Sequence, residues 1–433
     1  MKGLFKTEIA NAFMYYKVIR GKVMKKVLMI TYDFPPFVTV GAIRPLKFAK
    51  YLPKFGWQPI ILTVNHPGPF TYKLNYRFMQ NDIKKIKIYR SLEFPLIWIS
   101  KGLRIFGINS KWFFIPDPRY GWFFSSVFLG KKIIKKEKID IIYATSPPPV
   151  ALLVGVFLKK SCNIPLIIDY RDLWTGNPFV SYPTKFHFNL ERKMERWVLK
   201  HAEIISVVND NMKQKLLRSF TFLDDSKVVV IPNGYDPEDF RKVNPKKFSK
   251  FTILYAGSIY GRRVRYFKLL LETVNELIQE GSVLMEDFQL IFVGYLAKAA
   301  RKILNRIHLP NVYYLGVRNH EETIRFMLGA DVLLLIPGTS ETLTSKIFEY
   351  LAAQKFILNI SDGNGQASRF IENMKAGKTV NSLTLRETLH KILTFKDTRV
   401  TVNYEELNKF SKYSLTKLLA SKLELIYSRS LKR

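Results

Sequence analysis

The sequence predicts an α/β protein with two similar halves. Short apolar runs that end at proline or glycine recur along the chain, and most are followed by a segment with apolar residues at helical spacing. The pattern starts at residue 26, stops in a polar stretch that contains lysine and proline, and starts again at residue 251. We therefore expect two Rossmann-like domains of parallel strands and helices.

The first domain is expected over residues 24–235. The run 26–36 is its first expected strand, because it is apolar and two prolines stop it. A helix should then start at Gly41 and end near Gly56. The further strands of this domain are expected at 59–64, 139–149, 164–169, 203–208 and 227–231, with helices at 151–159 and 191–202.

The second domain is expected over residues 251–403, after a linker at 236–250. The final segment, 404–433, has leucines at helical spacing and is expected to be one helix. The clearest strands of this half are expected at 251–257, 288–294 and 330–337.

Composition limits the partners and cofactors. The net charge of +34 suits an anionic membrane surface, an anionic substrate or nucleic acid. No nucleic-acid-binding motif occurs, so we expect no nucleic-acid partner. Cys162 is the only cysteine, which excludes an internal disulfide and fits a reducing cytosol. No Cys/His cluster and no G-x-G-x-x-G motif occur, so we expect neither a metal nor a dinucleotide cofactor.

Two segments combine apolar and cationic residues. Residues 1–23 have the pattern of a basic amphipathic helix at a membrane interface; an unstructured leader, or a true start at Met24, is the alternative. Residues 92–136 interleave aromatic side chains with lysine and arginine, as a surface in contact with lipid headgroups requires; a helix pair in the core is the alternative. We expect a cytoplasmic protein, peripheral on the inner face of the cell membrane, without a transmembrane helix. The aromatic residues of this expected face include Phe94, Trp98, Trp112, Phe113, Trp122 and Phe123.

The strongest motif places two carboxylates, Glu341 and Glu349, eight positions apart between a buried run and a helical segment. A helix start between them would present free N–H groups and the positive end of the helix dipole, which suit a phosphate. Glu349 could accept hydrogen bonds from two sugar hydroxyls, and Glu341 could face the other side of the same ligand. The alternative is that both carboxylates are ordinary solvated charges. The loop and helix start comprise Thr344, Ser345, Lys346 and Ile347.

Two further segments place polar residues at strand ends. Gly257 ends a strand, and the loop from Ser258 carries Arg262 and Arg263, whose planar, bidentate guanidinium groups suit phosphate.

After the strand 164–169 come Arg171, Asp172 and Trp174, at a place where open parallel sheets bind ligands. Asp172 is a candidate for engaging an acceptor hydroxyl, with Arg171 orienting it. An ion pair between the two that fixes the loop is the alternative.

These motifs resemble, in chain order, those of retaining glycosyltransferases of family 4. The matching parts are the element 169–174, the Pro-Asn-Gly segment 232–234 and the Glu-x7-Glu motif 341–349. The segment 115–122 resembles an element of a branch that modifies lipid-linked or cell-envelope acceptors. In one departure, Leu343 and Thr344 stand where the family often has Phe-Gly. The resemblance implies the GT-B fold, two Rossmann-like domains that face each other across a cleft.

The resemblance also implies residue roles. Glu349 would hold the nucleotide ribose, Glu341 would lie near the donor sugar, and Lys346 would join an arginine at the pyrophosphate. That arginine would be Arg262, Arg263 or Arg265. The remaining implied positions are Gly316 and Val317 at the nucleobase, Gly41 in a loop that faces the donor, and a last helix that crosses back onto the first domain.

We therefore expect a bacterial cell-envelope polysaccharide-type enzyme. It would move a hexosyl or N-acetylhexosaminyl group from a nucleotide diphosphate-sugar to a hydroxyl of a lipid-linked or cell-envelope glycan, with retention of configuration. Its catalytic residues would be Asp172, Arg171 and Glu341. A nucleotide-sugar epimerase on the same fold and a non-catalytic membrane-associated subunit are the alternatives.

Overall fold

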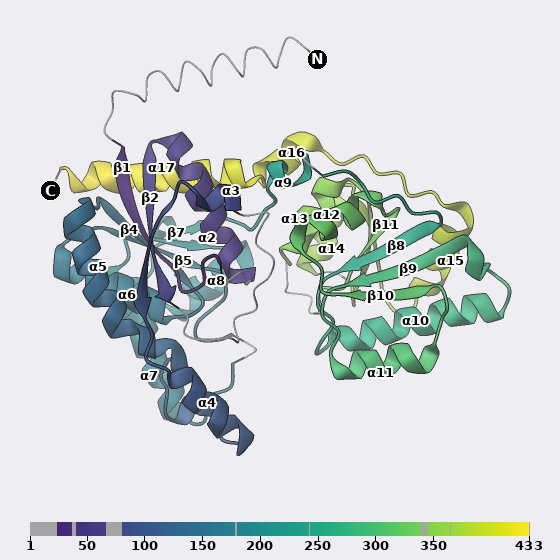
Figure 1. Ribbon diagram of the computed structural model, residues 1–433, viewed down its shortest axis with the longest axis horizontal. Helices are drawn as coiled ribbons and strands as arrows, with labels where there is room; N and C mark the ends of the chain where they lie inside the picture. The colour runs from purple at the N-terminus through teal and green to yellow at the C-terminus, as the bar shows by residue number, and fades with distance from the viewer. Residues whose placement is uncertain are drawn as a thin grey trace, which may run out of the picture. The chain divides into compact units, whose positions relative to one another are not determined.

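The computed structural model describes residues 24–36, 40–65, 80–177, 180–241, 243–338, 344–363 and 365–432. These residues form two compact units (Figure 1). The first unit contains the described residues up to Ile231 together with the C-terminal segment from Thr416, and the second contains those of Pro232–Leu415. The expected N-terminal amphipathic segment, 1–23, lies outside the described residues, as does Glu341.

The first unit is built on a seven-stranded parallel sheet in the order β3-β2-β1-β4-β5-β6-β7. Its strands are β1 (Lys25–Ile30), β2 (Trp57–Asn65), β3 (Lys87–Leu92), β4 (Ile141–Ser146), β5 (Leu166–Tyr170), β6 (Ile204–Val207) and β7 (Val228–Val230). Its helices are α2 (Val40–Tyr51), α3 (Gln80–Ile83), α4 (Leu96–Ile105), α5 (Phe123–Glu137), α6 (Val150–Cys162), α7 (Lys185–His201) and α8 (Asp210–Ser219). Short 3-10 turns are η1 (Leu52–Phe55), η3 (Ser110–Trp112), η4 (Pro118–Trp122) and η5 (Asp225–Lys227).

The order of this sheet reverses between β1 and β4, which pair with each other although two strands lie between them in the chain. Helices α5 to α8 pack on one face, and α2 contacts the other through Phe48, whose ring meets that of Tyr143 at 6.2 Å. Edge strand β3 was not expected, because its short stretch of mixed residues lacks an apolar run. Ligands of such sheets bind where the strand order reverses.

Most of the side chains named for the expected aromatic face over 92–136 are exposed, but two of them are buried. Trp122 and Phe123 lie in the core, because η4 and the first turn of α5 turn them against the sheet. The alternative of a helix pair in the core therefore holds only for this part. The exposed large apolar side chains of the segment are Leu92, Phe94, Trp98, Ile99, Ile105, Phe106, Ile108, Trp112, Phe113, Phe124 and Phe128.

The second unit contains a six-stranded parallel sheet in the order β10-β9-β8-β11-β12-β13. Its strands are β8 (Phe251–Ala256), β9 (Phe288–Val293), β10 (Val312–Gly316), β11 (Val332–Leu335), β12 (Phe356–Ile360) and β13 (Gly377–Val380). Its helices are α9 (Pro237–Arg241), α10 (Arg263–Gln279), α11 (Lys298–Ile307), α12 (His320–Gly329), α13 (Lys346–Ala353), α14 (Gln366–Asn373), α15 (Leu385–Phe395) and α16 (Tyr404–Lys409), with the turn η6 (Met285–Asp287). Helices α10, α11 and α15 cover one face and α12, α13 and α14 the other (Figure 1). The order reverses between β8 and β11.

The segment expected as a linker, 236–250, is packed chain rather than a free connection. It contains α9, and the amide of Lys246 donates to the Arg325 carbonyl at 2.9 Å. Just before it, Gly234 lies so close to the Phe410 carbonyl that a Cβ would come within 2.0 Å of the oxygen. The glycine of the Pro-Asn-Gly motif is therefore required by packing.

The C-terminal segment forms two helices, α16 and α17 (Lys412–Ser430), where one was expected. The break has a local cause, since the Ser411 hydroxyl accepts the amide of Ser414 (3.1 Å) and so starts a new helix. The segment from Thr416 packs on the first unit, where the Tyr427 ring contacts Trp57 at 5.9 Å and Glu424 pairs with Lys25. Within the described ranges, none of the helices has the length and apolar character that a bilayer crossing requires.

Candidate active site

In the second unit, the candidate site lies where the sheet order reverses. Strands β8 and β11 pair only at Ile253 and Leu254, and beyond that point Tyr350 of α13 joins them. The Ala256 amide donates to its hydroxyl at 2.9 Å, and the hydroxyl donates to the Leu334 carbonyl at 3.2 Å. Because Tyr350 is 1% exposed and bonded to both strands, it fixes the start of α13 beside their carboxyl ends.

Two of the three candidate arginines of this site, Arg262 and Arg263, differ in their contacts. The Arg263 guanidinium donates to the carbonyls of Ser258 (3.1 Å) and Pro337 (3.3 Å), so it ties the loop after β8 to the loop after β11. Arg262 is exposed, and its side chain has no hydrogen bond or ion pair with a described residue. Arg263 is therefore a structural tether, and Arg262 is the guanidinium that can turn to a ligand.

Glycines end three neighbouring strands at this edge. Gly294, after β9, has φ +126, and a Cβ there would lie 2.0 Å from the Gly257 carbonyl oxygen. Its amide donates to the carbonyl of Gly316 at 2.8 Å. The structure thus brings Gly257 and Gly316 together through their contacts with Gly294. The sequence analysis did not identify Gly294. Val317 is next in the chain and 56% exposed.

The start of α13 offers fewer free amides than expected. The Ile347 amide is already bonded to the Thr344 carbonyl at 3.2 Å, and the Ile347 side chain is in the core. This amide is therefore not free in this structure, and its expected role at the donor stays a prediction. Among described residues, no acceptor bonds the amides of Ser345 and Lys346, and the buried Thr344 hydroxyl also lacks a partner there.

Glu349 is not an ordinary solvated carboxylate. It accepts a hydrogen bond from Lys346 Nζ at 2.6 Å, and its side chain is 16% exposed. Burial would raise its pKa, but the charges of Lys346, His320 and Lys412 outweigh burial and hold the pKa below its usual value. Two of these groups were missed, because His320 and Lys412 come from distant parts of the chain. His320 Nε2 also lies 3.2 Å from Asp239 Oδ2.

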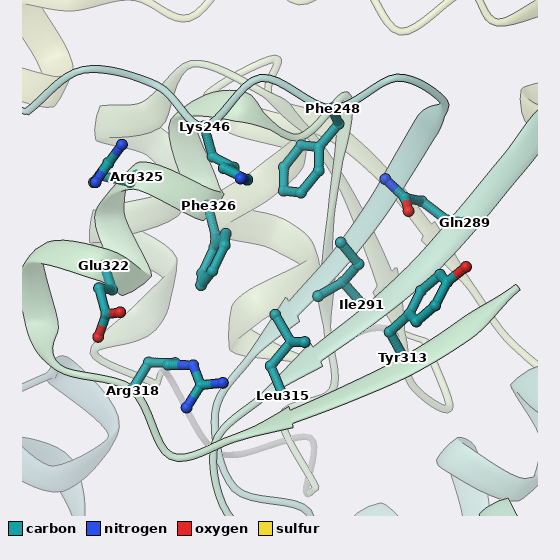
Figure 2. Close-up of a pocket in the computed structure, with 10 residues that line it drawn as sticks. All are labelled: Lys246, Phe248, Gln289, Ile291, Tyr313, Leu315, Arg318, Glu322, Arg325 and Phe326. Carbon is teal, nitrogen blue, oxygen red and sulfur yellow. The ribbon is translucent and has the colours of Figure 1, made fainter.

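Away from this site, a hollow of about 520 Å³ lies on the face of the sheet of the second unit, over β9 and β10 and beside α12 (Figure 2). Its floor is apolar, and Lys246, Arg318 and Arg325 stand around it without an ion pair to any described residue. None of the predicted site residues lines it. Its lining is Lys246, Phe248, Gln289, Ile291, Tyr313, Leu315, Arg318, Glu322, Arg325 and Phe326.

In the first unit, the carboxyl end of β5 is organised by a buried ion pair that was not predicted. Arg44 is 3% exposed and bonds both oxygens of Asp169, at 3.0 Å and 2.8 Å. The hydroxyls of Thr145 (2.8 Å) and Ser206 donate to the same carboxylate. Burial alone would raise the pKa of Asp169, but Arg44 and the hydroxyls lower it to about 2.

Arg171 and Asp172 do not form the ion pair that was the alternative to a catalytic role. The Arg171 guanidinium binds three carbonyls, those of Ser146 (3.2 Å), Gly41 and Pro147. It brings Gly41 to the end of β5 and fixes the loop. Asp172 follows with an exposed side chain, and partial desolvation raises its pKa while Arg171 opposes that shift.

The rest of this loop is held by two buried acids of α7. Trp174 Nε1 donates to Glu191 Oε2 at 2.8 Å, and the Thr175 amide donates to Glu195 Oε2 at 3.0 Å. Both glutamates are almost fully buried, and burial raises the pKa of Glu195 to about 7. Lys111 pairs with Glu191 and so connects η3 to the same loop. Asp172 is therefore an exposed residue of a loop that buried side chains hold in place.

Comparison with known proteins identifies this arrangement. The model of the family described as Glycosyltransferase Family 4 matches residues 45–239, most of the first unit. This match indicates a glycosyltransferase. No curated protein matches it.

Solved structures resemble this glycosyltransferase along most of its length. The Anabaena protein HepE in complex with UDP and glucose is 14% identical, with a TM-score of 0.62 over 92% of this chain and 99% of that chain. The sucrose-phosphate synthase of Thermosynechococcus elongatus is 15% identical, with a TM-score of 0.62 over 94% and 99%. A Listeria monocytogenes protein assigned as a UDP-N-acetylglucosamine 2-epimerase is 13% identical, with a TM-score of 0.58 over 94% and 97%. The two parallel sheets are those of the GT-B fold, as the sequence predicts.

Proposed function

We propose that this glycosyltransferase moves a hexosyl or N-acetylhexosaminyl group from a nucleotide diphosphate-sugar to a hydroxyl of a lipid-linked or cell-envelope glycan, with retention of configuration. The observation that carries the proposal is the Lys346–Glu349 pair at the start of α13, beside the carboxyl ends of β8 and β11. Within one helical turn it offers a cation for phosphate and an ionised carboxylate for ribose hydroxyls. The UDP and UDP-glucose complexes of HepE support a nucleotide-sugar donor.

Donor binding would exchange the partners of this pair. Lys346 leaves Glu349 for the diphosphate, and Glu349 then accepts hydrogen bonds from the ribose. Glu349 is suited to this because its lowered pKa keeps it ionised at neutral pH. Charge that develops on the departing diphosphate would be stabilised by Lys346, Arg262 and the unbonded amides of Ser345 and Lys346. Glu341, outside the described residues, keeps its proposed place near the donor sugar.

On the acceptor side, we assign Asp172 to the acceptor hydroxyl. Its side chain is exposed at the carboxyl end of β5, while Arg171 holds the loop through carbonyl groups and is a positioning residue. The proposal includes no covalent intermediate, because Asp172 is assigned to the acceptor hydroxyl and Glu349 to the ribose.

The exposed aromatic side chains of α4, η3 and α5 would place the first unit on an anionic membrane. Ile105 and Phe106 are 83% and 80% exposed. Lys101 and Lys132 lie over exposed aromatic rings, at 4.9 Å from Trp98 and 4.2 Å from Phe128. This combination suits a layer of anionic headgroups over acyl chains, and it supports the proposal of a lipid-linked acceptor on the inner face of the cell membrane.

Thermal shift with UDP, GDP, ADP and their sugar conjugates tests the donor site. A nucleotide that binds only the folded protein stabilises it by about 2.7 kcal/mol at a hundredfold excess over its dissociation constant. One nucleotide should raise the melting temperature of the wild type and not that of Glu349→Ala. Glu387→Ala, which removes an exposed helix carboxylate paired with Lys391, is the matched control and should respond as the wild type does. Absence of a shift with every nucleotide would contradict the proposal.

An epimerase is the second candidate, supported by the likeness to the Listeria protein. Incubation with UDP-N-acetylglucosamine and no acceptor separates the two. An epimerase converts the donor under these conditions, whereas the proposed transferase leaves it intact apart from slow hydrolysis.

Flotation with phosphatidylglycerol vesicles tests the membrane surface. Phe106→Ser together with Phe113→Ser should reduce flotation, because both side chains are exposed on the first unit. Leu383→Ser is the control, since Leu383 is 87% exposed but belongs to the second unit. Trp122 is unsuitable for this test because it is buried. Equal flotation of the double variant and the wild type would remove the membrane surface from the proposal.

A further inference from the structure

A hollow of about 560 Å³ lies in the first unit, at the carboxyl end of edge strand β3. It is separate from the carboxyl end of β5, after which Arg171 and Asp172 lie. Its wall is mainly apolar, and Glu93 is the one carboxylate in its lining. The lining residues are Leu92, Glu93, Phe94, Pro95, Leu96, Tyr120, Gly121, Phe124 and Ser125.

The segment 115–122, one of the sequence motifs that has no part in the donor site, builds this pocket. Gly121 lies against the Phe94 carbonyl, where a Cβ would come within 2.2 Å of the oxygen. The Phe94 amide donates back to the Gly121 carbonyl at 3.1 Å. Trp122 donates from Nε1 to the Ser91 hydroxyl at 2.7 Å. These contacts hold the chain after β3 and the motif together as two sides of one hollow.

Glu93 lines this hollow, and one of its two carboxylate oxygens accepts a hydrogen bond. The Tyr32 hydroxyl donates to Glu93 Oε1 at 2.7 Å, and no described residue bonds Oε2. Burial raises the pKa of Glu93 to about 7, although the Tyr32 hydrogen bond and the charge of Arg119 oppose the shift and Asp117 adds to it. The Arg119 guanidinium lies over the Tyr32 ring at 5.5 Å and only loosely contacts Asp117, at 3.9 Å. A cation with capacity for a ligand therefore stands near an apolar pocket.

We propose that this pocket binds the first apolar units of a lipid diphosphate that carries the acceptor glycan, with Arg119 facing the diphosphate. The inference rests on the proposed function and assigns its acceptor a second, separate contact. Three of the lining residues, Leu92, Phe94 and Phe124, are 65–73% exposed and are continuous with the aromatic face described above. A chain could thus pass from a membrane into the pocket without crossing polar surface.

The lining also argues against other occupants. A free sugar would leave most of its hydroxyls unpaired, because the side chains there offer only Glu93, Tyr120 and Ser125 as hydrogen-bonding partners. A small anion without an apolar part would find no cation among the lining residues. An apolar chain that ends in a diphosphate satisfies both the wall and the neighbouring Arg119.

Binding of farnesyl diphosphate to the full chain, followed by tryptophan fluorescence in vesicle-free buffer, tests the inference. The wild type should bind it at least about tenfold more tightly than inorganic diphosphate, since the chain supplies the apolar contact. Phe124→Ala should weaken binding roughly fivefold. Phe128→Ala is the matched control, because Phe128 lies one turn further on α5, is 63% exposed and does not line the pocket. Leu96→Trp, which fills the hollow, should remove chain-dependent binding.

Three outcomes would overturn the inference. These are equal effects of Phe124→Ala and Phe128→Ala, equal affinity for inorganic diphosphate, and equal affinity for oleate, which would assign the pocket to an acyl chain of the bilayer. The result is separable from that of the donor test. A nucleotide shift without farnesyl diphosphate binding would remove only this inference, whereas farnesyl diphosphate binding without a nucleotide shift would remove the proposed donor site.

Discussion

The two candidate sites of this glycosyltransferase use charge in opposite ways. At the carboxyl ends of β8 and β11, Arg262 and Lys346 keep contact with solvent, and the one described partner of the Lys346 side chain, Glu349, is one that a ligand can replace. At the carboxyl end of β5, Arg44 and Asp169 are buried and bonded to each other and to neighbouring groups. Arg262 and Lys346 of the second unit are therefore available to a ligand, whereas Arg44 and Asp169 of the first unit hold the structure in place.

This difference predicts separable effects of substitution. Removing a solvent-facing charge from the site of the second unit should weaken ligand binding and leave folding intact. Removing a buried, bonded charge from the first unit should destabilise that unit. All six tryptophans of the chain lie in the first unit, so tryptophan fluorescence reports the unfolding of that unit alone.

The largest effect is expected for Asp169→Ala. The substitution leaves the Arg44 guanidinium buried without its carboxylate, which costs about 3–5 kcal/mol of unfolding free energy. Urea denaturation followed by tryptophan fluorescence measures this loss. Asp172→Ala, three residues further on and exposed, is the control and should change the unfolding free energy by less than about 0.5 kcal/mol. Equal losses for the two variants would contradict the assignment of Asp169 to the scaffold.

The next effect concerns Glu195 and depends on pH. Its pKa is about 7 in the folded state against an unperturbed 4.5, so folding favours its protonated form. Its contribution to stability is therefore fully present below about pH 4.5 and is lost as the pH rises through 7. Glu195→Gln lacks this titration, so from pH 5 to pH 8 the wild type should lose up to about 3 kcal/mol relative to the variant. Parallel pH profiles of the two unfolding midpoints would contradict the shift.

In the second unit, Lys346→Ala should act on binding. Loss of a charge-assisted contact to diphosphate lowers nucleotide affinity by about 1.5–3 kcal/mol, or roughly 10- to 100-fold. The melting temperature without ligand should stay close to that of the wild type. Isothermal titration with the nucleotide found by thermal shift measures the affinity. Lys391→Ala, which also breaks an exposed helix ion pair, should bind as the wild type does. An unchanged nucleotide affinity of Lys346→Ala would show that the diphosphate does not bind at the start of α13.

The sequence predicts the candidate site of the second unit better than that of the first unit. The reason is the number of residues along the chain that separate the interacting partners. The end of β11 and the start of α13 follow from local signals, an apolar run and helical spacing, and α13 begins at Lys346 within the expected loop-to-helix segment. The Arg44–Asp169 pair joins residues 125 positions apart, and no local pattern indicates it. The sequence did contain a signal for the role of α7, although the prediction did not use it. Glu191 and Glu195 lie four positions apart and share a helix face with Val198.

The aromatic segment 92–136 shows the same limit. Its composition indicates a surface, and most of its apolar side chains are exposed, but composition does not separate Trp122 from Trp112. Only the sheet, on which η4 packs through Tyr32 and Ser91, decides that Trp122 is buried. The donor-site glycines were found as strand ends, whereas Gly294 becomes visible only through its contact with Gly257.

The smallest effects are expected for the neighbouring arginines of the second unit. They test within one loop whether structural charges and ligand-binding charges are separate. Arg263→Ala removes two hydrogen bonds to carbonyls and should lower the stability of that unit by about 1–2 kcal/mol. Arg262→Ala removes an exposed guanidinium and should leave stability unchanged but weaken nucleotide binding by about 1 kcal/mol, roughly fivefold. Melting temperature and titration with the same nucleotide give both quantities for each variant. If Arg262→Ala lowered stability and Arg263→Ala lowered only nucleotide binding, the two roles would be reversed. Arg262 would then be the structural tether and Arg263 the ligand contact. If both variants changed both quantities equally, the separation between scaffold charge and ligand charge would not extend to adjacent residues of one loop.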